Sequence, residues 1–240
     1  MRSGASTRII AHRGVSAVEA ENTMRAFHTA ASHGADMVEA DIHLSSDGHP
    51  VVHHDSSLLH GDDEVPLASL DRDTLTGLQP ETSIPTLHEL LSWAQDKVSV
   101  YLDLKAPGAG TAAMSLVKTF DMTNQVIAGS FDPNLIAESR DALPEVETSI
   151  LVGLPQPGEM LELANDIGTD YAHPCWENAH STPSHLLGGD FLEDARRSGV
   201  GIVTWQEDRP SELDALLALG VDAICTNEPD RLYALREACY

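Results

Sequence analysis

The segment Val38-Glu-Ala-Asp-Ile-His-Leu-Ser-Ser-Asp-Gly-His-Pro-Val-Val-His-His-Asp55 decides how the rest of the chain is interpreted. Its first half alternates between apolar and polar residues, as a β-strand with two different faces does. Glu39 and Asp41 are two residues apart, so they point to the same side of this strand and are close enough to share a cation. A half-exposed strand with a solvated polar face would alternate in the same way, and the remaining sequence has to decide between the two.

Short apolar segments alternate with helical segments along the whole chain. Besides the strand that ends at Leu44, strands are expected at 8–14, 98–105, 126–131, 147–152, 170–173, 201–205 and 223–226. Helices are expected at 21–33, 86–95, 110–121, 133–142, 157–167, 184–198, 210–219 and 229–237. Eight strands, each followed by a helix or a helix-bearing connection, predict an α/β fold, the (β/α)₈ TIM barrel. An open doubly wound sheet is the alternative, but the sequence lacks the G-x-G-x-x-G turn that such a sheet often carries.

Residues 45–85 interrupt this alternation and are rich in Asp, Ser, Gly and Pro. They predict a small insertion after the second strand, with short β-segments at best, inside a single barrel domain that spans residues 1–240. Both faces of every strand in a parallel barrel are covered, so Glu39 and Asp41 have no solvated face except the mouth of the barrel. Barrel enzymes have their active sites at that mouth. The barrel therefore favours a functional site over a solvated strand face.

Polar residues stand at the ends of the predicted strands, where the mouth would be. Three of them are carboxylates, Glu39, Asp41 and Asp103, and like charges about 4 Å apart repel by about 4 kcal/mol at an effective dielectric constant of about 20. The three carboxylates tolerate each other only if they are protonated or share a cation. For a shared cation, an all-oxygen set without thiols favours Mg²⁺ or Ca²⁺ over zinc. We therefore predict that these three residues bind a divalent metal ion.

Positive and titratable side chains are expected beside these carboxylates. Arg13 and Lys105 would make an anion site suited to a phosphate group, although Lys105 could also be a plain counter-ion for Asp103. His12 and His54 come from separate segments, as a general acid and a general base on two sides of a reaction centre do. Of the ten other histidines, six are expected to be surface or internally satisfied residues, and four are left open: His43, His49, His53 and His173.

With these residues the chain resembles the glycerophosphodiester phosphodiesterases, which are metal-dependent barrel enzymes. The resemblance covers nearly the whole chain and rests on motifs that occur in order. They are His12-Arg13-Gly14, Glu21-Asn22-Thr23 with Ala26-Phe27, Gly34-Ala-Asp-Met-Val-Glu39-Ala-Asp41, Asp47-Gly48-His-Pro-Val-Val-His-His54-Asp55, Ile84-Pro-Thr-Leu-His-Glu89, Leu102-Asp-Leu-Lys105, Gly129-Ser-Phe131 and Gly220-Val-Asp-Ala-Ile-Cys-Thr226-Asn-Glu-Pro229.

The resemblance implies hydrolysis of a glycerophosphodiester to glycerol 3-phosphate and an alcohol. It implies His12 and His54 as the acid–base pair, Glu39 and Asp41 as metal ligands, Arg13 and Lys105 on the phosphate, and Trp205 as a wall for the substrate. Three features depart from the family pattern: Asp103 stands where the family commonly has Glu, Asn227 replaces the usual Asp after Thr226, and the insertion looks shortened. The alcohol, the choice between Mg²⁺ and Ca²⁺, the nucleophile (water or the glycerol 2-hydroxyl) and the oligomeric state are left open.

Two other functions are compatible with part of this pattern. A related barrel acting on lysophospholipids or inositol phospholipids would need an apolar mouth or membrane-binding loops, and the acidic insertion argues against these. A non-catalytic barrel that only binds a phosphate ligand would need a broken site, whereas His12, His54, Glu39 and Asp41 are all present.

The charge of the chain limits its partners. It carries 38 acidic against 14 basic residues, a net charge of −24, which repels nucleic acid and anionic membranes. We therefore expect a small-molecule substrate, no nucleic acid and no stable membrane association. The lack of a signal peptide or a membrane-length apolar run, and an odd number of widely spaced cysteines (Cys175, Cys225, Cys239), suit the cytoplasm.

The same charge predicts a halophilic protein, with an acidic mesophilic protein as the alternative. High salt screens the mutual repulsion of surface carboxylates, so we expect structure to be lost when the salt is diluted from molar to millimolar concentration. Circular dichroism measures this directly. A spectrum that stays unchanged over the dilution would contradict the halophilic interpretation.

Overall fold

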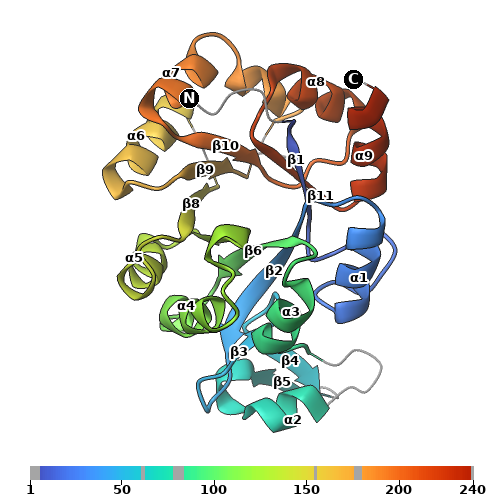
Figure 1. Cartoon of the computed structure of the whole chain (residues 1–240), viewed down its shortest axis with the longest axis vertical. Coiled ribbons are helices and arrows are strands. Elements are labelled where there is room, and N and C mark those ends of the chain that lie inside the picture. Colours follow the sequence, from blue (N-terminus) through green and yellow to red (C-terminus); the bar gives the residue numbers. More distant parts are fainter. Residues whose placement is uncertain (1–5, 61–62, 78–83, 154–155, 176–179, 239–240) are drawn as a thin grey trace.

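The computed structural model describes residues 6–60, 63–77, 84–153, 156–175 and 180–238. Eight parallel strands close into a barrel that is surrounded by helices (Figure 1). They are β1 (Arg8–Ala11), β2 (Met37–Leu44), β6 (Ser99–Leu104), β7 (Val126–Ser130), β8 (Glu147–Val152), β9 (Tyr171–Pro174), β10 (Gly201–Thr204) and β11 (Ala223–Thr226). The first strand closes the barrel because it pairs in parallel with both β11 and β2. The predicted (β/α)₈ TIM barrel is confirmed.

Helices connect the strands and cover the outside of the barrel. They are α1 (Met24–Ser32), α3 (Leu87–Ala94), α4 (Ala109–Thr119), α5 (Pro133–Ala142), α6 (Pro157–Ile167), α7 (Phe191–Ser198), α8 (Pro210–Leu219) and α9 (Pro229–Ala238). The helix expected at 184–198 is instead a 3₁₀ turn, η3 (Pro183–Leu187), followed by α7. Gly188 and Gly189 separate the two, and Gly189 has a φ of +67°, which ends a right-handed helix. In the described part of the chain, none of the helices combines the length and the apolar character that crossing a bilayer requires.

The apolar core is divided by the barrel wall. Outward-facing strand residues pack against the helices, whereas inward-facing ones fill the barrel. The inward set includes Ile10, Met37, Tyr101, Ile127, Leu151, Tyr171, Val203, Ala223 and Cys225. Cys239 lies outside the described residues. Because side chains alternate along β2, Met37, Glu39 and Asp41 follow one another up the inner face, from the apolar interior toward the mouth.

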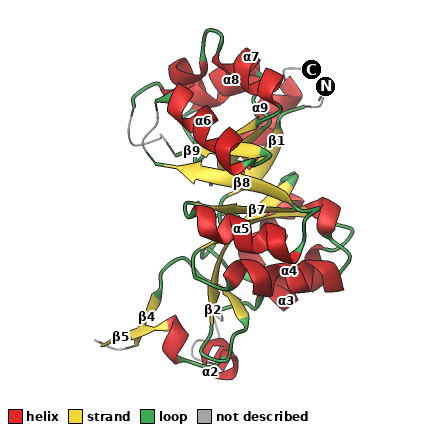
Figure 2. Cartoon of the chain, turned by 90° about the vertical axis from the view of Figure 1, so that its left-hand side faces the viewer, coloured by secondary structure: helices red, strands yellow, loops and turns green. Residues whose placement is uncertain are grey.

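The predicted insertion contains more structure than short β-segments. It holds β3 (Pro50–Val52), the hairpin β4 (Ser57–His60) and β5 (Asp63–Pro66), the turn η1 (Leu67–Ser69) and helix α2 (Arg72–Gly77). Figure 2 shows β4, β5 and α2 at one end of the molecule, far from α6 to α9. A small cluster of Val51, Leu67, Leu75 and Ile84 holds it together. Residues 61–62 and 78–83 of this segment lie outside the described residues.

The insertion also returns the chain to the barrel mouth. Strand β3 pairs antiparallel with the end of β2, with Val52 opposite Ile42. The backbone N–H of His53 then donates to the carbonyl of Asp41 at 3.0 Å. The turn between the two strands needs Gly48, which has a φ of +79°. This hairpin explains why His54, far beyond Asp41 along the chain, lies beside it in space.

Candidate active site

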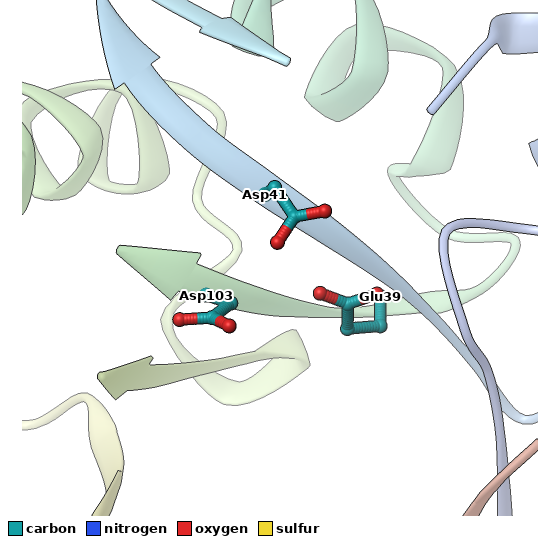
Figure 3. A group of neighbouring side chains, drawn as sticks. All are labelled: Glu39, Asp41 and Asp103. Atoms are coloured by element: carbon teal, nitrogen blue, oxygen red, sulfur yellow. The ribbon is translucent and has the colours of Figure 1, made fainter. Parts of the chain in front are cut away.

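Three carboxylates meet at the inner face of β2 and β6. Asp41 and Asp103 occupy paired positions of the two strands, and Glu39 lies one inward-facing position below Asp41. Each contributes one carboxylate oxygen, and these oxygens all lie within 4.8 Å of one another (Figure 3). All three side chains are buried, so water screens their mutual repulsion only weakly. The structure thus brings together the three residues predicted as metal ligands.

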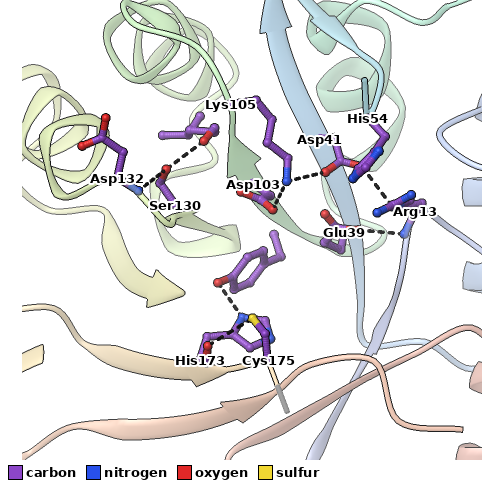
Figure 4. Close-up of polar contacts among 12 residues, drawn as sticks. Arg13, Glu39, Asp41, His54, Asp103, Lys105, Ser130, Asp132, His173 and Cys175 are labelled. Carbon is purple, nitrogen blue, oxygen red and sulfur yellow. Dashed lines mark hydrogen bonds and ion pairs between the residues drawn. The ribbon is translucent and has the colours of Figure 1, made fainter. Parts of the chain in front are cut away.

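Two cations lie against these acids. The Nζ of Lys105 is 3.0 Å from Asp41 Oδ1 and 2.5 Å from Asp103 Oδ2. The Nε of Arg13 is 3.2 Å from Asp41 Oδ2, and its backbone N–H donates to Glu39 Oε2 at 2.8 Å (Figure 4). Asp41 is therefore paired with both cations, whereas Glu39 accepts a hydrogen bond from a backbone amide and, among the described residues, forms no ion pair.

The protonation of the three acids follows from this unequal pairing. Burial, together with the charges of Asp41 and Asp103, raises the pKa of Glu39 well above its usual range. Burial also raises the pKa of Asp103 to about 7, against the opposing effect of Lys105. Burial would raise the pKa of Asp41 too, but Lys105 and Arg13 together outweigh it and lower that pKa. Three carboxylates facing two cations leave one negative charge to be balanced by a proton or by a further cation.

The residues present fit a hard divalent cation. Oε1 of Glu39 and Oδ1 of Asp103 are buried, and no described residue donates a hydrogen bond to either oxygen. A buried carboxylate oxygen without a partner is costly, and coordination to a cation removes that cost. An oxygen-only set of this kind suits Mg²⁺ or Ca²⁺. Asp103, although one methylene shorter than glutamate, still reaches the other two acids.

The loop before α1 fixes the geometry of these acids. Asn22 is buried and has a φ of +56°, a conformation that asparagine tolerates better than most residues. Its Nδ2 donates to Asp41 Oδ2 at 2.8 Å, and its backbone N–H donates to the carbonyl of Arg13 at 2.9 Å. Gly14, at a φ of +85°, lies so close to Ala26 that a Cβ would come within 2.6 Å of it. Thr23, the next residue, caps α1.

His12 lies buried at the end of β1. Its Nδ1 is 2.8 Å from Oδ1 of Asn227, and its ring centroid is 5.6 Å from that of Trp205. Burial, followed by the charge of Arg13, lowers the pKa of His12 to about 4, so the ring is neutral at pH 7. A cavity of about 310 Å³ opens beside His12 and Arg13 and offers room for a small polar molecule.

Two aromatic rings lie beside Lys105 and form an aromatic wall. The Nζ of Lys105 lies 5.9 Å from the ring centroids of both Trp205 and Phe131, and those two rings are 5.8 Å apart. Trp205 was predicted to line the substrate site. Phe131, half exposed after β7, belongs to the Gly129-Ser-Phe131 motif, but no sequence pattern connects it with Trp205.

His54 lies at the rim of the mouth, just beyond β3. Its side chain is 40% exposed, and its Nδ1 is 2.8 Å from Asp55 Oδ1. Nε2 of His43 donates to the His54 carbonyl at 3.2 Å, which ties this short loop to β2. Figure 4 shows His54 on the same side of the mouth as Arg13. The two predicted acid–base histidines therefore reach the mouth from different elements, one buried and one open to solvent.

His173, left without a role by the sequence, is fully buried inside the barrel. Its Nδ1 is 2.8 Å from the hydroxyl of Tyr101, and its ring lies 5.0 Å from Trp205. Burial, and to a lesser extent the nearby His12, lowers the pKa of His173 to about 3. His173 thus packs beneath Trp205 inside the barrel as a neutral ring.

This burial predicts an acid-dependent loss of stability. Unfolded His173 takes up a proton near pH 6.5, whereas the native ring stays neutral down to about pH 3. The free energy of unfolding therefore falls as the pH drops through 6.5, by about 2 kcal/mol from this residue between pH 7 and 5. In His173→Gln this contribution disappears, so urea unfolding at the two pH values should show a drop smaller by about 2 kcal/mol. The exposed-site control His28→Gln should keep the wild-type drop, and an equal drop in His173→Gln would contradict the assignment.

Comparison with known proteins bears on what such a site does. A family model described as "Glycerophosphoryl diester phosphodiesterase family" matches residues 12–231. A glycerophosphodiester phosphodiesterase of Caldanaerobacter subterraneus subsp. tengcongensis is 29% identical and covers 95% of this chain and 97% of its own length. A probable glycerophosphodiester phosphodiesterase 2 of Mycobacterium tuberculosis is 30% identical and covers 93% and 88%, respectively.

Solved structures agree with the fold. A glycerophosphodiester phosphodiesterase from Parabacteroides distasonis matches with a TM-score of 0.81 and 25% identity over 98% of both chains. An Oleispira antarctica phosphodiesterase, solved in complex with its product sn-glycerol-3-phosphate, matches with a TM-score of 0.82 and 22% identity over 97% of both chains. The similarity extends over the whole barrel in each case.

Proposed function

Because this chain belongs to the glycerophosphoryl diester phosphodiesterase family, we propose that it hydrolyses glycerophosphodiesters to glycerol 3-phosphate and an alcohol in a metal-dependent reaction. The observation that carries this proposal is the buried carboxylate group Glu39, Asp41 and Asp103 with Arg13 and Lys105 beside it. Two relatives that match over most of their length carry this activity in their names, which supports the choice of substrate class.

Charge balance supports a divalent ion as the cofactor. With all three acids ionised, the group has a net charge of −1 after Arg13 and Lys105 are counted. A Mg²⁺ or Ca²⁺ ion held by Glu39, Asp41 and Asp103 would make it +1, which complements the single negative charge of a phosphodiester. Such an ion, when bound, polarises the phosphoryl oxygen and offsets the charge that develops in the transition state.

Arg13 and Lys105 would bind and orient the phosphate. Both are held by Asp41, which fixes them on two sides of the same carboxylate. Their N–H groups can donate to the nonbridging oxygens, and a guanidinium does so in a planar, directional way. Trp205 and Phe131 would exclude water from one side of the substrate.

His12 and His54 would move the protons. One histidine accepts the proton of the nucleophile and the other donates a proton to the departing alcohol oxygen. Their placement supports this division, because His12 is buried next to Arg13 while His54 stands at the rim, where a leaving alcohol can escape to solvent.

Release of glycerol 3-phosphate from glycerophosphocholine tests the proposal. We expect release in the presence of Mg²⁺ or Ca²⁺, none in EDTA, and a fall in kcat/KM of about 10²- to 10⁴-fold in His12→Ala, the usual contribution of a general acid or base. The assay should be run in high salt, where the acidic surface is screened.

The control variant is His28→Ala, an exposed histidine on α1 that should retain wild-type rates. Release that persists in EDTA, or an unchanged rate in His12→Ala, would contradict the proposed chemistry. Binding of glycerophosphocholine without turnover by any metal-loaded protein would instead favour the non-catalytic alternative.

A further inference from the structure

A chain of hydrogen bonds connects His12 to a carboxylate that the proposed reaction does not use. Oδ1 of Asn227 is 2.8 Å from Nδ1 of His12, and Nδ2 of Asn227 is 2.7 Å from Oδ2 of Asp208. Oδ1 of Asp208 accepts from the hydroxyl of Thr226 at 2.7 Å and from the backbone N–H of Asn227 at 2.8 Å. Asp208, Asn227 and His12 thus form one line across the loops that follow β10, β11 and β1.

The chemistry of Asp208 decides which way the Asn227 amide faces. An ionised carboxylate can only accept hydrogen bonds, so the NH₂ group of Asn227 has to face Asp208. The opposite orientation would place two acceptor oxygens 2.7 Å apart. The carbonyl oxygen of Asn227 therefore faces His12, and the hydroxyl of Ser16 donates to the same oxygen.

The orientation of this amide decides in turn which nitrogen of His12 carries the proton. A carbonyl oxygen cannot donate, so Nδ1 of His12 has to be the protonated nitrogen. Its Nε2 is then an unprotonated acceptor. That nitrogen is buried, and no residue in the described segments forms a hydrogen bond with it.

We propose that Asp208, acting through Asn227, holds the proton of His12 on Nδ1 and keeps Nε2 as the nitrogen that exchanges a proton at the reaction centre. Asp208 and Asn227 are positioning residues in this proposal, since both act through His12, and both also line the cavity beside His12 and Arg13. The exchange of a proton by Nε2 rests on the proposed function, whereas the tautomer itself does not.

Long-range ¹H–¹⁵N correlation spectra of the histidine-labelled full-length protein measure the tautomer without any assay. At neutral pH we expect the His12 resonances, identified by their loss in His12→Ala, to show a protonated Nδ1 and an unprotonated Nε2. A protonated Nε2 in the wild type would overturn the proposal, even if the variants at positions 208 and 227 failed to fold.

In the variant Asp208→Asn we expect the opposite tautomer of His12. The Oδ1 at position 208 would still accept from Thr226 and from the backbone of Asn227, so the new NH₂ group would face the Asn227 side chain. Asn227 would have to turn its carbonyl oxygen toward position 208 and its NH₂ toward His12, which moves the His12 proton to Nε2. We expect kcat to fall about 10- to 100-fold, as is typical when a partner that orients a functional side chain is lost, with little change in KM.

The double variant Asp208→Asn/Asn227→Asp should reverse this effect. A carboxylate at position 227 accepts both from the new amide at position 208 and from His12, so the proton returns to Nδ1 and the kcat lost in Asp208→Asn is largely regained. Asp230→Asn, an exposed change in the first turn of α9, should leave spectrum and kcat as in the wild type. An unchanged tautomer and kcat in Asp208→Asn would overturn the proposal. Absence of phosphodiesterase activity in every protein, with the tautomer pattern as expected, would refute only the proposed function.

Discussion

The structure of the barrel mouth depends on one imbalance: three buried carboxylates face two cations. Glu39, Asp41 and Asp103 cannot move apart, because they project from paired strands of a closed sheet. Water cannot screen them, because they are buried. Lys105 contacts both Asp41 and Asp103, and Arg13 and the amide of Asn22 contact Asp41. Among the described residues, Glu39 is therefore the carboxylate without a side-chain cation beside it. A site with this composition is suited to binding a cation together with a phosphate.

Much of this site could be predicted from the sequence because the β-period of two is simple. Glu39 and Asp41, like Asp103 and Lys105, are spaced by two, and apolar strands that alternate with helices fix which ends of the strands meet. Asn22, Phe131 and Asp208 could not be found in this way. Their positions depend on loop backbone, such as the positive φ of Arg13 and Asn22, and on contacts between loops far apart in the sequence.

The structure of the insertion, like that of the site, could be predicted only in part from the sequence. Its composition predicts a departure from the βα pattern, but it does not predict the helix α2. What matters for the site is that β3 pairs back onto β2 and leads directly to His54. A short antiparallel strand therefore delivers an exposed histidine to the rim of a mouth whose other groups are buried, and the floor beneath is built from neutral aromatic and histidine rings.

Calorimetric titration of chelator-stripped protein with Mg²⁺ and with Ca²⁺, in salt high enough to screen the acidic surface, tests the central claim most directly. The account predicts one saturable site per chain for at least one of the two ions. It also predicts that Asp103→Asn weakens or abolishes this site, while the exposed substitution Asp141→Asn leaves it intact. No saturable binding of either ion, or equal binding by Asp103→Asn, would contradict the claim that the three buried carboxylates form a metal site.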